Sequence, residues 1–160
     1  MTQALWRAMT TNDIGRVEEI SDEVHGAYTE PGDVYAERLQ LHPSGCFVLE
    51  GDEGIIGYMT THPWRRAALP GLGEMLGAIP PDADTYYLHD IALLPAARGS
   101  GSGRSAIKLV KAEAAAAGLD EVTLIAVNGA DRFWASQGFA YDGEGGYGEG
   151  TFRMRLPVDR

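Results

Sequence analysis

Cysteine, basic residues and long apolar runs are scarce in this chain of 160 residues. Cys46 is the only cysteine, which excludes an internal disulfide and fits a reducing compartment. No stretch approaches the roughly 18 uncharged apolar residues of a membrane span, so we expect no transmembrane helix. The net charge of −10 also predicts no membrane partner, because an anionic membrane surface would repel the protein. The first residues, MTQALWRAMTTND, lack the basic and apolar pattern of a signal peptide, which predicts a cytoplasmic protein.

Positive charge is in the minority. Lys and Arg total 13 against 23 Asp and Glu, and the formal net charge is −10. Such a surface repels a phosphate backbone at long range, so nucleic acid is not expected as a partner, whereas a cationic small molecule or basic peptide would be attracted. The four histidines, at positions 25, 42, 62 and 89, show no metal-ligand spacing, and we expect no metal site.

The length of 160 residues predicts one domain over residues 1–160, and apolar periodicity predicts strands and helices within it. Strands are predicted at 5–9, 46–50, 55–61, 86–94, 122–127 and 151–156, and helices at 10–24, 33–41, 104–117 and 131–136. Segment 62–85, rich in proline and glycine, is predicted to be an irregular insertion between the third and fourth strands, with a short helix at 72–79. A hairpin followed by a strand–helix–strand unit predicts a mixed α/β sheet.

The sharpest pattern is Arg98-Gly99-Ser100-Gly101-Ser102-Gly103, between a buried strand and a strong helix-forming segment. Glycines let the backbone adopt positive φ and approach a ligand closely. The first turn of a helix adds unpaired N–H groups and the positive end of the helix dipole. The pattern therefore predicts a binding site for a phosphate or pyrophosphate. A flexible strand-to-helix turn is the alternative.

Three related motifs do not fit. The chain has no Gly-Lys pair, which a P-loop needs. Neither Ser100 nor Ser102 satisfies the Gly-x-Ser-x-Gly pattern of a nucleophile elbow. The segment 101–106 matches the G-x-G-x-x-A dinucleotide pattern, but Asp120 and Glu121 precede the next strand, whereas a ribose-binding acid ends it. A Rossmann-type oxidoreductase is therefore the third-ranked hypothesis.

The remaining interpretation is coenzyme A. Arg98-x-x-Gly101-x-Gly103, after a strand that ends Ala92-Leu93-Leu94-Pro95, resembles the acetyl-CoA loop of the GNAT N-acetyltransferase superfamily. Two other segments agree: the Thr-x-x-Asp start of the first helix, and Asn128 followed by Phe133-Trp134 and Gly138-Phe139, which is similar to the family's Asn…Tyr…Gly-Phe segment. The resemblance covers most of the chain. It implies an α/β fold with a mixed, mostly antiparallel central sheet of about six to seven strands, flanked by helices, whose central strands splay apart.

The resemblance also implies where acetyl-CoA binds. Backbone groups of Leu93 and Leu94 would pair with the pantetheine amides, and backbone N–H groups of 100–104 would hold the pyrophosphate. Asn128 would bond pantetheine, with a turn-forming role before Gly129 as the alternative. The implied coenzyme-binding residues are Leu93, Leu94, Arg98, Gly99, Ser100, Gly101, Ser102, Gly103, Arg104 and Asn128. Arg98 could instead bond carbonyls of the loop.

Asp90 matches the position where many family members carry a glutamate base. A carboxylate near the acetyl group can take the proton of an ammonium group. Burial in an apolar strand is expected to raise the Asp90 pKa. The alternative is an aspartate bonded to neighbouring backbone or to His89. Strand alternation places His89 on the opposite face, where we interpret it as a hydrogen-bonded core histidine.

Trp134 replaces the tyrosine that often protonates the CoA thiolate in this family. An indole N–H donates a hydrogen bond but gives up no proton at neutral pH. We therefore interpret Trp134 as a group that packs against pantetheine or the core. The candidates for a general acid are Tyr141, Tyr147, or no protein group at all.

Together these features predict a bacterial-type N-acetyltransferase that moves an acetyl group from acetyl-CoA directly to a primary amine of a small molecule or peptide. Acids and aromatics occur in the segments expected to face the acceptor: Tyr28, Glu30, Tyr35, Trp64, Glu74, Asp82 and Asp84. The alternative, in another class, is a catalytically weak CoA-binding sensor or interaction module. A homodimer is left open.

Overall fold

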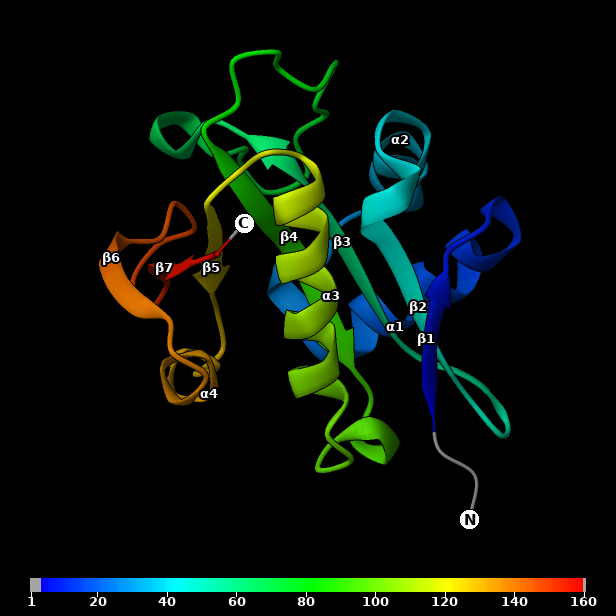
Figure 1. Ribbon diagram of the computed structural model, residues 1–160. Coiled ribbons are helices and arrows are strands. Elements are labelled where there is room, and N and C mark those ends of the chain that lie inside the picture. Colours follow the sequence, from blue (N-terminus) through cyan, green and yellow to red (C-terminus); the bar gives the residue numbers. More distant parts are fainter. Residues whose placement is uncertain (1–3, 160) are drawn as a thin grey trace.

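The strands lie in one sheet of order β1-β2-β3-β4-β5-β7-β6 in the computed structural model, which describes residues 4–159 (Figure 1). Neighbours are antiparallel except β4 and β5. The bounds are β1 Leu5–Ala8, β2 Cys46–Gly51, β3 Gly54–Trp64, β4 Thr85–Leu93, β5 Glu121–Ala126, β6 Ala140–Glu144 and β7 Phe152–Pro157. This is the mostly antiparallel α/β sheet that the sequence predicts.

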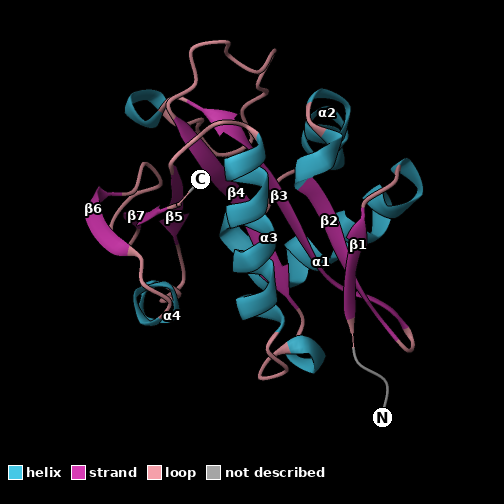
Figure 2. Cartoon of the chain, viewed as in Figure 1, coloured by secondary structure: helices cyan, strands magenta, loops and turns pink. Residues whose placement is uncertain are grey.

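Helices cover both faces of the sheet (Figure 2). The helices are α1 Ile14–His25, α2 Gly32–Leu41, α3 Ser102–Ala116 and α4 Asp131–Ser136. Val17 of α1 and Tyr35 of α2 pack with Tyr58 in the core on one face, and Val110 of α3 packs with Leu124 and Trp134 in the core on the other. The sheet therefore separates two hydrophobic cores.

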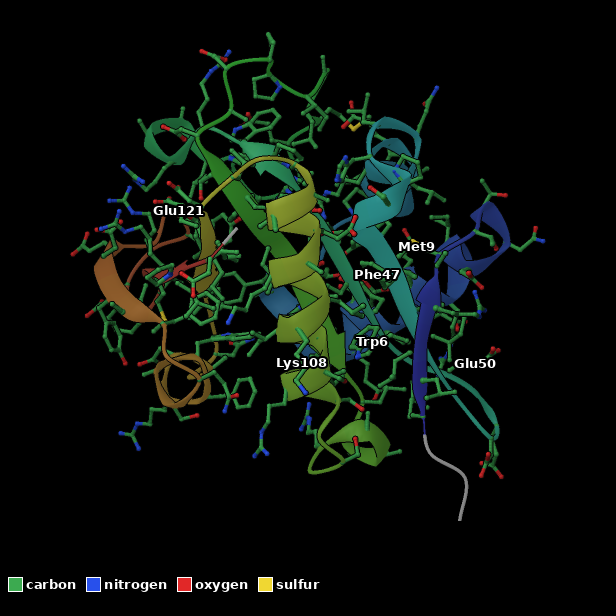
Figure 3. All side chains as sticks on the ribbon, in the orientation of Figure 1. Trp6, Met9, Phe47, Glu50, Lys108 and Glu121 are labelled. Atoms are coloured by element: carbon green, nitrogen blue, oxygen red, sulfur yellow. The ribbon has the colours of Figure 1, made fainter. Side chains whose placement is uncertain are left out.

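The partly buried aromatic residues of the first two strands extend the core under α3. Trp6 and Phe47 lie beside this helix, whereas Lys108 lies on its solvent-facing side (Figure 3). The Trp6 indole donates a hydrogen bond to the carbonyl of Ser102, 3.0 Å away. The edge of the sheet thus fixes the start of α3.

The first helix begins as its sequence predicts. The backbone N–H of Thr10 donates to a carboxylate oxygen of Asp13 at 2.8 Å, which closes a capping box, and Arg7 donates to the same carboxylate at 2.9 Å. Gly26, with φ 55°, ends α1 directly after His25. The end of this helix is therefore fixed at a residue that reaches the candidate site.

The central strands β4 and β5 pair over three residues only. Tyr86, Tyr87 and Leu88 lie opposite 122–124, and no further pairs follow, although β4 continues to Leu93 and β5 to Ala126. The two strands diverge toward the end of the sheet where the glycine loop enters α3 (Figure 1). Their divergence is the splay implied by the family resemblance.

A β-bulge in β4 changes the face on which His89 lies. Thr60 pairs with Asp90 and Thr61 pairs with Leu88, which leaves His89 as the extra residue. His89 and Asp90 consequently both face α1 and α2, where they contact Arg38 and Tyr35. The expected placement of His89 on the opposite face is wrong, because regular alternation does not hold across a bulge.

Another expectation about secondary structure is also wrong. No helix forms at 72–79, because the N–H groups of Gly73, Leu76 and Gly77 donate to the side chains of Glu30 and Glu37 instead of to helical carbonyls.

The glycine-rich segment after α4 contains an additional strand. β6 pairs with β7, and its mostly exposed side chains provide no apolar alternation by which the sequence could reveal it. The irregular part of the insertion is shorter than expected, since β3 extends to Trp64.

Candidate active site

A cavity of about 600 Å³ lies where β4 and β5 diverge. Leu88 and Leu124, which belong to the core under α3, line it together with His25 and Tyr28 at the end of α1. Because the lining comes from both faces, the cavity crosses the sheet through the gap between the strands. Its volume is that of a site for a small ligand or a cofactor arm.

The N-terminus of α3 forms one end of this cavity. Gly101 precedes the helix in the left-handed region, φ 86°, and no side chain caps it. The first intrahelical bond runs from the N–H of Ser105 to the carbonyl of Gly101 at 3.0 Å, so the N–H groups of 102–104 have no intrahelical acceptor. Such a helix terminus fits an anionic group such as a pyrophosphate.

The loop before α3 is organised by its own hydrogen bonds. The Ser100 hydroxyl lies 2.6 Å from the carbonyl of Ala97 and 2.8 Å from the Ser102 hydroxyl. Arg98 donates from Nε to the carbonyl of Leu93 at 3.2 Å. The carbonyl that Arg98 contacts thus belongs to the last residue of β4, whereas the alternative role expected a carbonyl of the loop. Arg104 is exposed at the cavity.

Gly103 has a packing requirement of its own. A Cβ at this position would lie 2.8 Å from Cζ of Phe133, which is shorter than a normal carbon–carbon contact. A side chain here would therefore require the Phe133 ring, which is 41% exposed, to shift.

The structure brings most of the predicted coenzyme residues together. Eight of the ten line the cavity: Leu93, Arg98, Gly99, Gly101, Ser102, Gly103, Arg104 and Asn128. Leu94 does not; its N–H donates to Ile56 and its carbonyl accepts from Ala97, both at 2.9 Å. Ser100 is also outside the lining. Asn128 adopts φ 54° before Gly129, so it forms the turn and lines the cavity as well.

Asp90 lies at the other end of the cavity and accepts three side-chain hydrogen bonds. Nε2 of His25 is 2.6 Å from its Oδ1. The hydroxyls of Tyr35 and Tyr58 lie 2.6 Å and 2.7 Å from its Oδ2. Burial and the charge of Asp90 raise the pKa of both phenols, so they stay protonated and act as donors.

These contacts determine the charge of Asp90 and His25. Burial raises the pKa of Asp90, but the charge and hydrogen bond of His25, with the charge of Arg38 and the Tyr35 hydroxyl, outweigh it and hold the pKa below its ordinary value. The expected rise is therefore wrong in sign. Burial lowers the pKa of His25, but the charge and hydrogen bond of Asp90 raise it above its ordinary value. The pair is an imidazolium next to a carboxylate over a range of pH.

His89 belongs to a chain of fixed donors. Arg38 can only donate, so Nε2 of His89, 3.1 Å away, is an acceptor. Nδ1 of His89 then donates to Nε2 of His62 at 2.9 Å, and Nδ1 of His62 donates to the carbonyl of Pro63. Burial, with the charge of Arg38, lowers the pKa of both histidines, that of His62 to about 3. His89 is the hydrogen-bonded core histidine that the sequence predicts.

Trp134 packs in the core and lines the cavity. Its ring contacts Phe133 and Phe139 edge-on, at 5.0 and 5.5 Å between centroids. Of the two tyrosines proposed as alternative acids, Tyr147 lines the cavity, whereas Tyr141 is exposed outside it and bonds Asp131 at 2.6 Å. Of these two tyrosines, Tyr147 is thus the one that lines the cavity.

Two of the residues expected to face the acceptor reach the cavity, Tyr28 and Glu30. Tyr28 lies 6.3 Å from Tyr147 between ring centroids. The others are engaged elsewhere: Tyr35 with Asp90, Trp64 with a backbone carbonyl, Glu74 with its own turn, and Asp82 and Asp84 with 65–66. In the described residues, no group of His, Cys, Asp or Glu is arranged to hold a metal ion.

His25 is the site residue that the sequence did not reveal. It is 65 positions from Asp90 and belongs to no motif. Its place as the last residue of a helix before a glycine is the one available signal, because a cationic side chain is stabilised at that end of the helix dipole.

Comparison with known proteins identifies the class. The model of the acetyltransferase (GNAT) family matches residues 14–139, most of the chain, and the protein belongs to this family. The family resemblance inferred from the glycine loop is confirmed. A comparison with curated protein sequences gives no match. No helix among the described residues is long and apolar enough to cross a membrane.

Solved structures of low sequence identity share the fold. Ard1 from Thermoplasma volcanium is 14% identical with a TM-score of 0.76, over 99% of this chain and 100% of that chain. Naa20 of Chaetomium thermophilum, solved with a bisubstrate analogue, is 20% identical with a TM-score of 0.73, over 96% and 86%. The ribosomal-protein-S18-alanine N-acetyltransferase of Escherichia coli is 16% identical with a TM-score of 0.70, over 99% and 96%.

Proposed function

We propose that the protein is an N-acetyltransferase that moves an acetyl group from acetyl-CoA directly to the primary amine of a peptide or small molecule. The observation that carries the proposal is the cavity through the sheet. Unpaired backbone N–H groups of 102–104 lie at one end, and the His25–Asp90 pair lies at the other. This arrangement fits a phosphate-bearing donor and an amine that meet between the splayed strands.

Direct transfer is favoured over a route through an acetylated cysteine. Cys46 is buried in the core under α1, outside the cavity lining, with 1% of its surface exposed. Burial raises the pKa of its thiol to about 12, so it carries little thiolate at neutral pH. The amine itself is then the nucleophile that attacks the thioester.

The chain's residues have separate tasks in this reaction. Backbone groups of 99–104 hold the pyrophosphate, with Arg104 as a charge at the mouth. Leu93 and Asn128 orient the pantetheine arm along the unpaired edge of β4. Asp90, together with the His25 imidazole bonded to it, removes the ammonium proton so that the nitrogen lone pair becomes available. Trp134 packs beside the reacting groups.

The test is acetyl-CoA turnover across a panel of amines, measured by thiol release. The panel contains peptides with free N-termini, polyamines, amino acids and aminoglycosides, and mass spectrometry locates the acetylated nitrogen. Peptides are the first members, because a structural neighbour is an alanine N-acetyltransferase that acts on a ribosomal protein. Turnover with at least one amine supports the proposal, and none with any amine contradicts it.

A CoA-binding sensor or interaction module is the second candidate. The observation in its favour is Trp134, whose indole cannot protonate a leaving thiolate. A module of this kind would bind acetyl-CoA in calorimetry yet release no thiol with any amine. An enzyme does both.

A further inference from the structure

We propose that Nδ1 of His25 is the atom that takes the proton from the acceptor ammonium, and that Asp90 positions this imidazole. The inference rests on the proposed function, since it assigns a step of that reaction. It assigns the base to the end of α1, outside the strand on which the sequence placed it.

The carboxylate of Asp90 is already saturated. One oxygen accepts from His25 and the other from the hydroxyls of Tyr35 and Tyr58. Only 8% of its side chain is exposed. An ammonium group would have to displace one of these donors to reach it, and three donors hold the carboxylate in its charged form, which makes it a weak base.

The same contacts fix the tautomer of His25. Nε2 of His25 lies 2.6 Å from Oδ1 of Asp90. Because the carboxylate can only accept, Nε2 carries the hydrogen of this bond. In the neutral imidazole the lone pair is therefore on Nδ1. Nδ1 has no hydrogen-bond partner in residues 4–159, and the ring lines the cavity. An unpaired basic nitrogen thus belongs to a ring that lines the cavity.

The other titratable groups of the lining are engaged. Both ring nitrogens of His89 are in use, toward Arg38 and His62. The two oxygens of Glu30 bind Arg38 and the N–H of Gly73, at 2.8 and 2.7 Å.

The remaining ionisable groups at this end are phenols. Burial raises the pKa of Tyr147, which keeps this phenol protonated, so it offers no phenolate to take a proton. Of the described groups at the acceptor end, His25 thus offers the free basic nitrogen.

The charges around His25 come from several elements. Asp90 on β4 bonds it directly, and Glu30 after α1 adds a second negative charge that raises its pKa. Tyr58 on β3 packs edge-on at 6.5 Å between centroids, and Tyr35 and Arg38 on α2 reach it through Asp90. Tyr28 and Tyr147 line the cavity on the acceptor side. The net effect raises the pKa of His25 above its ordinary value, which strengthens Nδ1 as a base.

The step balances as follows. Nδ1 takes one proton from R–NH₃⁺ and becomes an imidazolium, and the freed lone pair forms the C–N bond at the thioester carbonyl. The C–S bond then breaks, and its electron pair leaves on sulfur. The thiolate takes a second proton from the nitrogen, and the imidazolium releases its proton to solvent.

The decisive experiment compares pH profiles of kcat/KM in wild type, His25→Gln and Asp90→Asn. Glutamine can still donate to Asp90 from the position of Nε2 but has no basic nitrogen, so the rate should fall about 100-fold or more with acetyl-CoA affinity unchanged. In wild type, activity should rise with pH through the pKa of His25, independently of which amine is used. In Asp90→Asn this rise should move to lower pH, because the charge that raises the His25 pKa is gone.

Two further measurements separate catalysis from folding. Added imidazole should restore part of the rate of His25→Ala, which a purely structural role would not allow. NMR of the ring nitrogens of His25 should show the hydrogen on Nε2 and a pKa that falls in Asp90→Asn. His42→Gln, at a histidine outside the cavity lining, is the matched control and should keep wild-type activity.

The outcomes are distinguishable. If wild type turns over an amine while His25→Gln keeps nearly full activity, the base is elsewhere and the inference is overturned, although the proposed function stands. An Asp90→Asn variant that loses activity without moving the profile makes Asp90 the base and also overturns it. Absence of turnover in wild type with every amine overturns the proposed function, and this inference with it.

Discussion

Trp134 stands where the family resemblance implies a tyrosine, and its packing predicts how substitutions behave. If the indole only fills space between Phe133 and Phe139, Trp134→Phe should keep substantial activity and lose about 1–3 kcal/mol of stability. Trp134→Tyr adds a hydroxyl near the thiolate. It should be faster at high pH if thiolate protonation limits the rate, and otherwise match Trp134→Phe. Rate measurements on both variants across pH decide between these cases.

A large rate loss in both Trp134 variants would contradict a packing role, provided that thermal unfolding and acetyl-CoA affinity are unchanged. The indole N–H would then contribute to the transition state.

The His25–Asp90 pair also predicts how stability depends on pH. The folded-state pKa of His25 lies above its unfolded value of about 6.5, so its contribution is complete below that pH and is lost as pH rises through the folded pKa. The difference in unfolding free energy between wild type and His25→Gln should therefore shrink from pH 6 to pH 9. Urea unfolding at several pH values measures it, and a constant difference would show that His25 is not charged in the fold.

The contribution of Asp90 to stability depends on pH in the opposite direction. The pKa of Asp90 is lowered in the fold, so its contribution is present above the unfolded value and is lost as pH falls through the folded pKa. The pair is therefore most stabilising between these two limits.

Among the elements, the glycine loop gives the sharpest prediction. Gly101→Asp would place a carboxylate beside the free N–H groups at the start of α3 and should weaken acetyl-CoA binding about tenfold or more. The matched control is Gly150→Asp, since Gly150 has a similar φ, 81° against 86°, and equally open surroundings. Calorimetry on both variants separates the effect of charge from backbone strain. Equal affinities of the two variants for acetyl-CoA would show that the pyrophosphate does not bind at this loop.

How much the sequence predicts also differs between elements. The strand, loop and helix over 86–116 could be predicted, because local apolar patterns and glycines determine them. The bulge at His89 could not, since it depends on the pairing of β4 with β3. The same holds for β6, whose pairing with β7 supplies what its exposed side chains do not indicate. The helix expected at 72–79 is absent because Glu30 and Glu37, distant in sequence, satisfy its N–H groups.

The candidate site shows the same limit. Consecutive residues of the glycine loop could be predicted by motif, and six of the seven residues 98–104 line the cavity. The acceptor end is assembled from α1, α2, β3 and β4, so the partners of Asp90 are 32 to 65 positions away from it. No local pattern encodes such a cluster.

At the scale of the whole molecule, the gap between β4 and β5 has a kinetic consequence. The donor loop lies at the start of α3, on one side of the sheet, and His25 and Tyr28 lie on the other. In the proposed reaction we expect each substrate to have its own entrance, so that neither has to arrive first and a complex of both with the enzyme forms in either order. The acetylated product should compete with the amine, whereas in an enforced order with acetyl-CoA first it would not, and product-inhibition patterns test this directly. An enzyme with one shared mouth would instead enforce an order, and its released CoA would hold the acceptor out until it left.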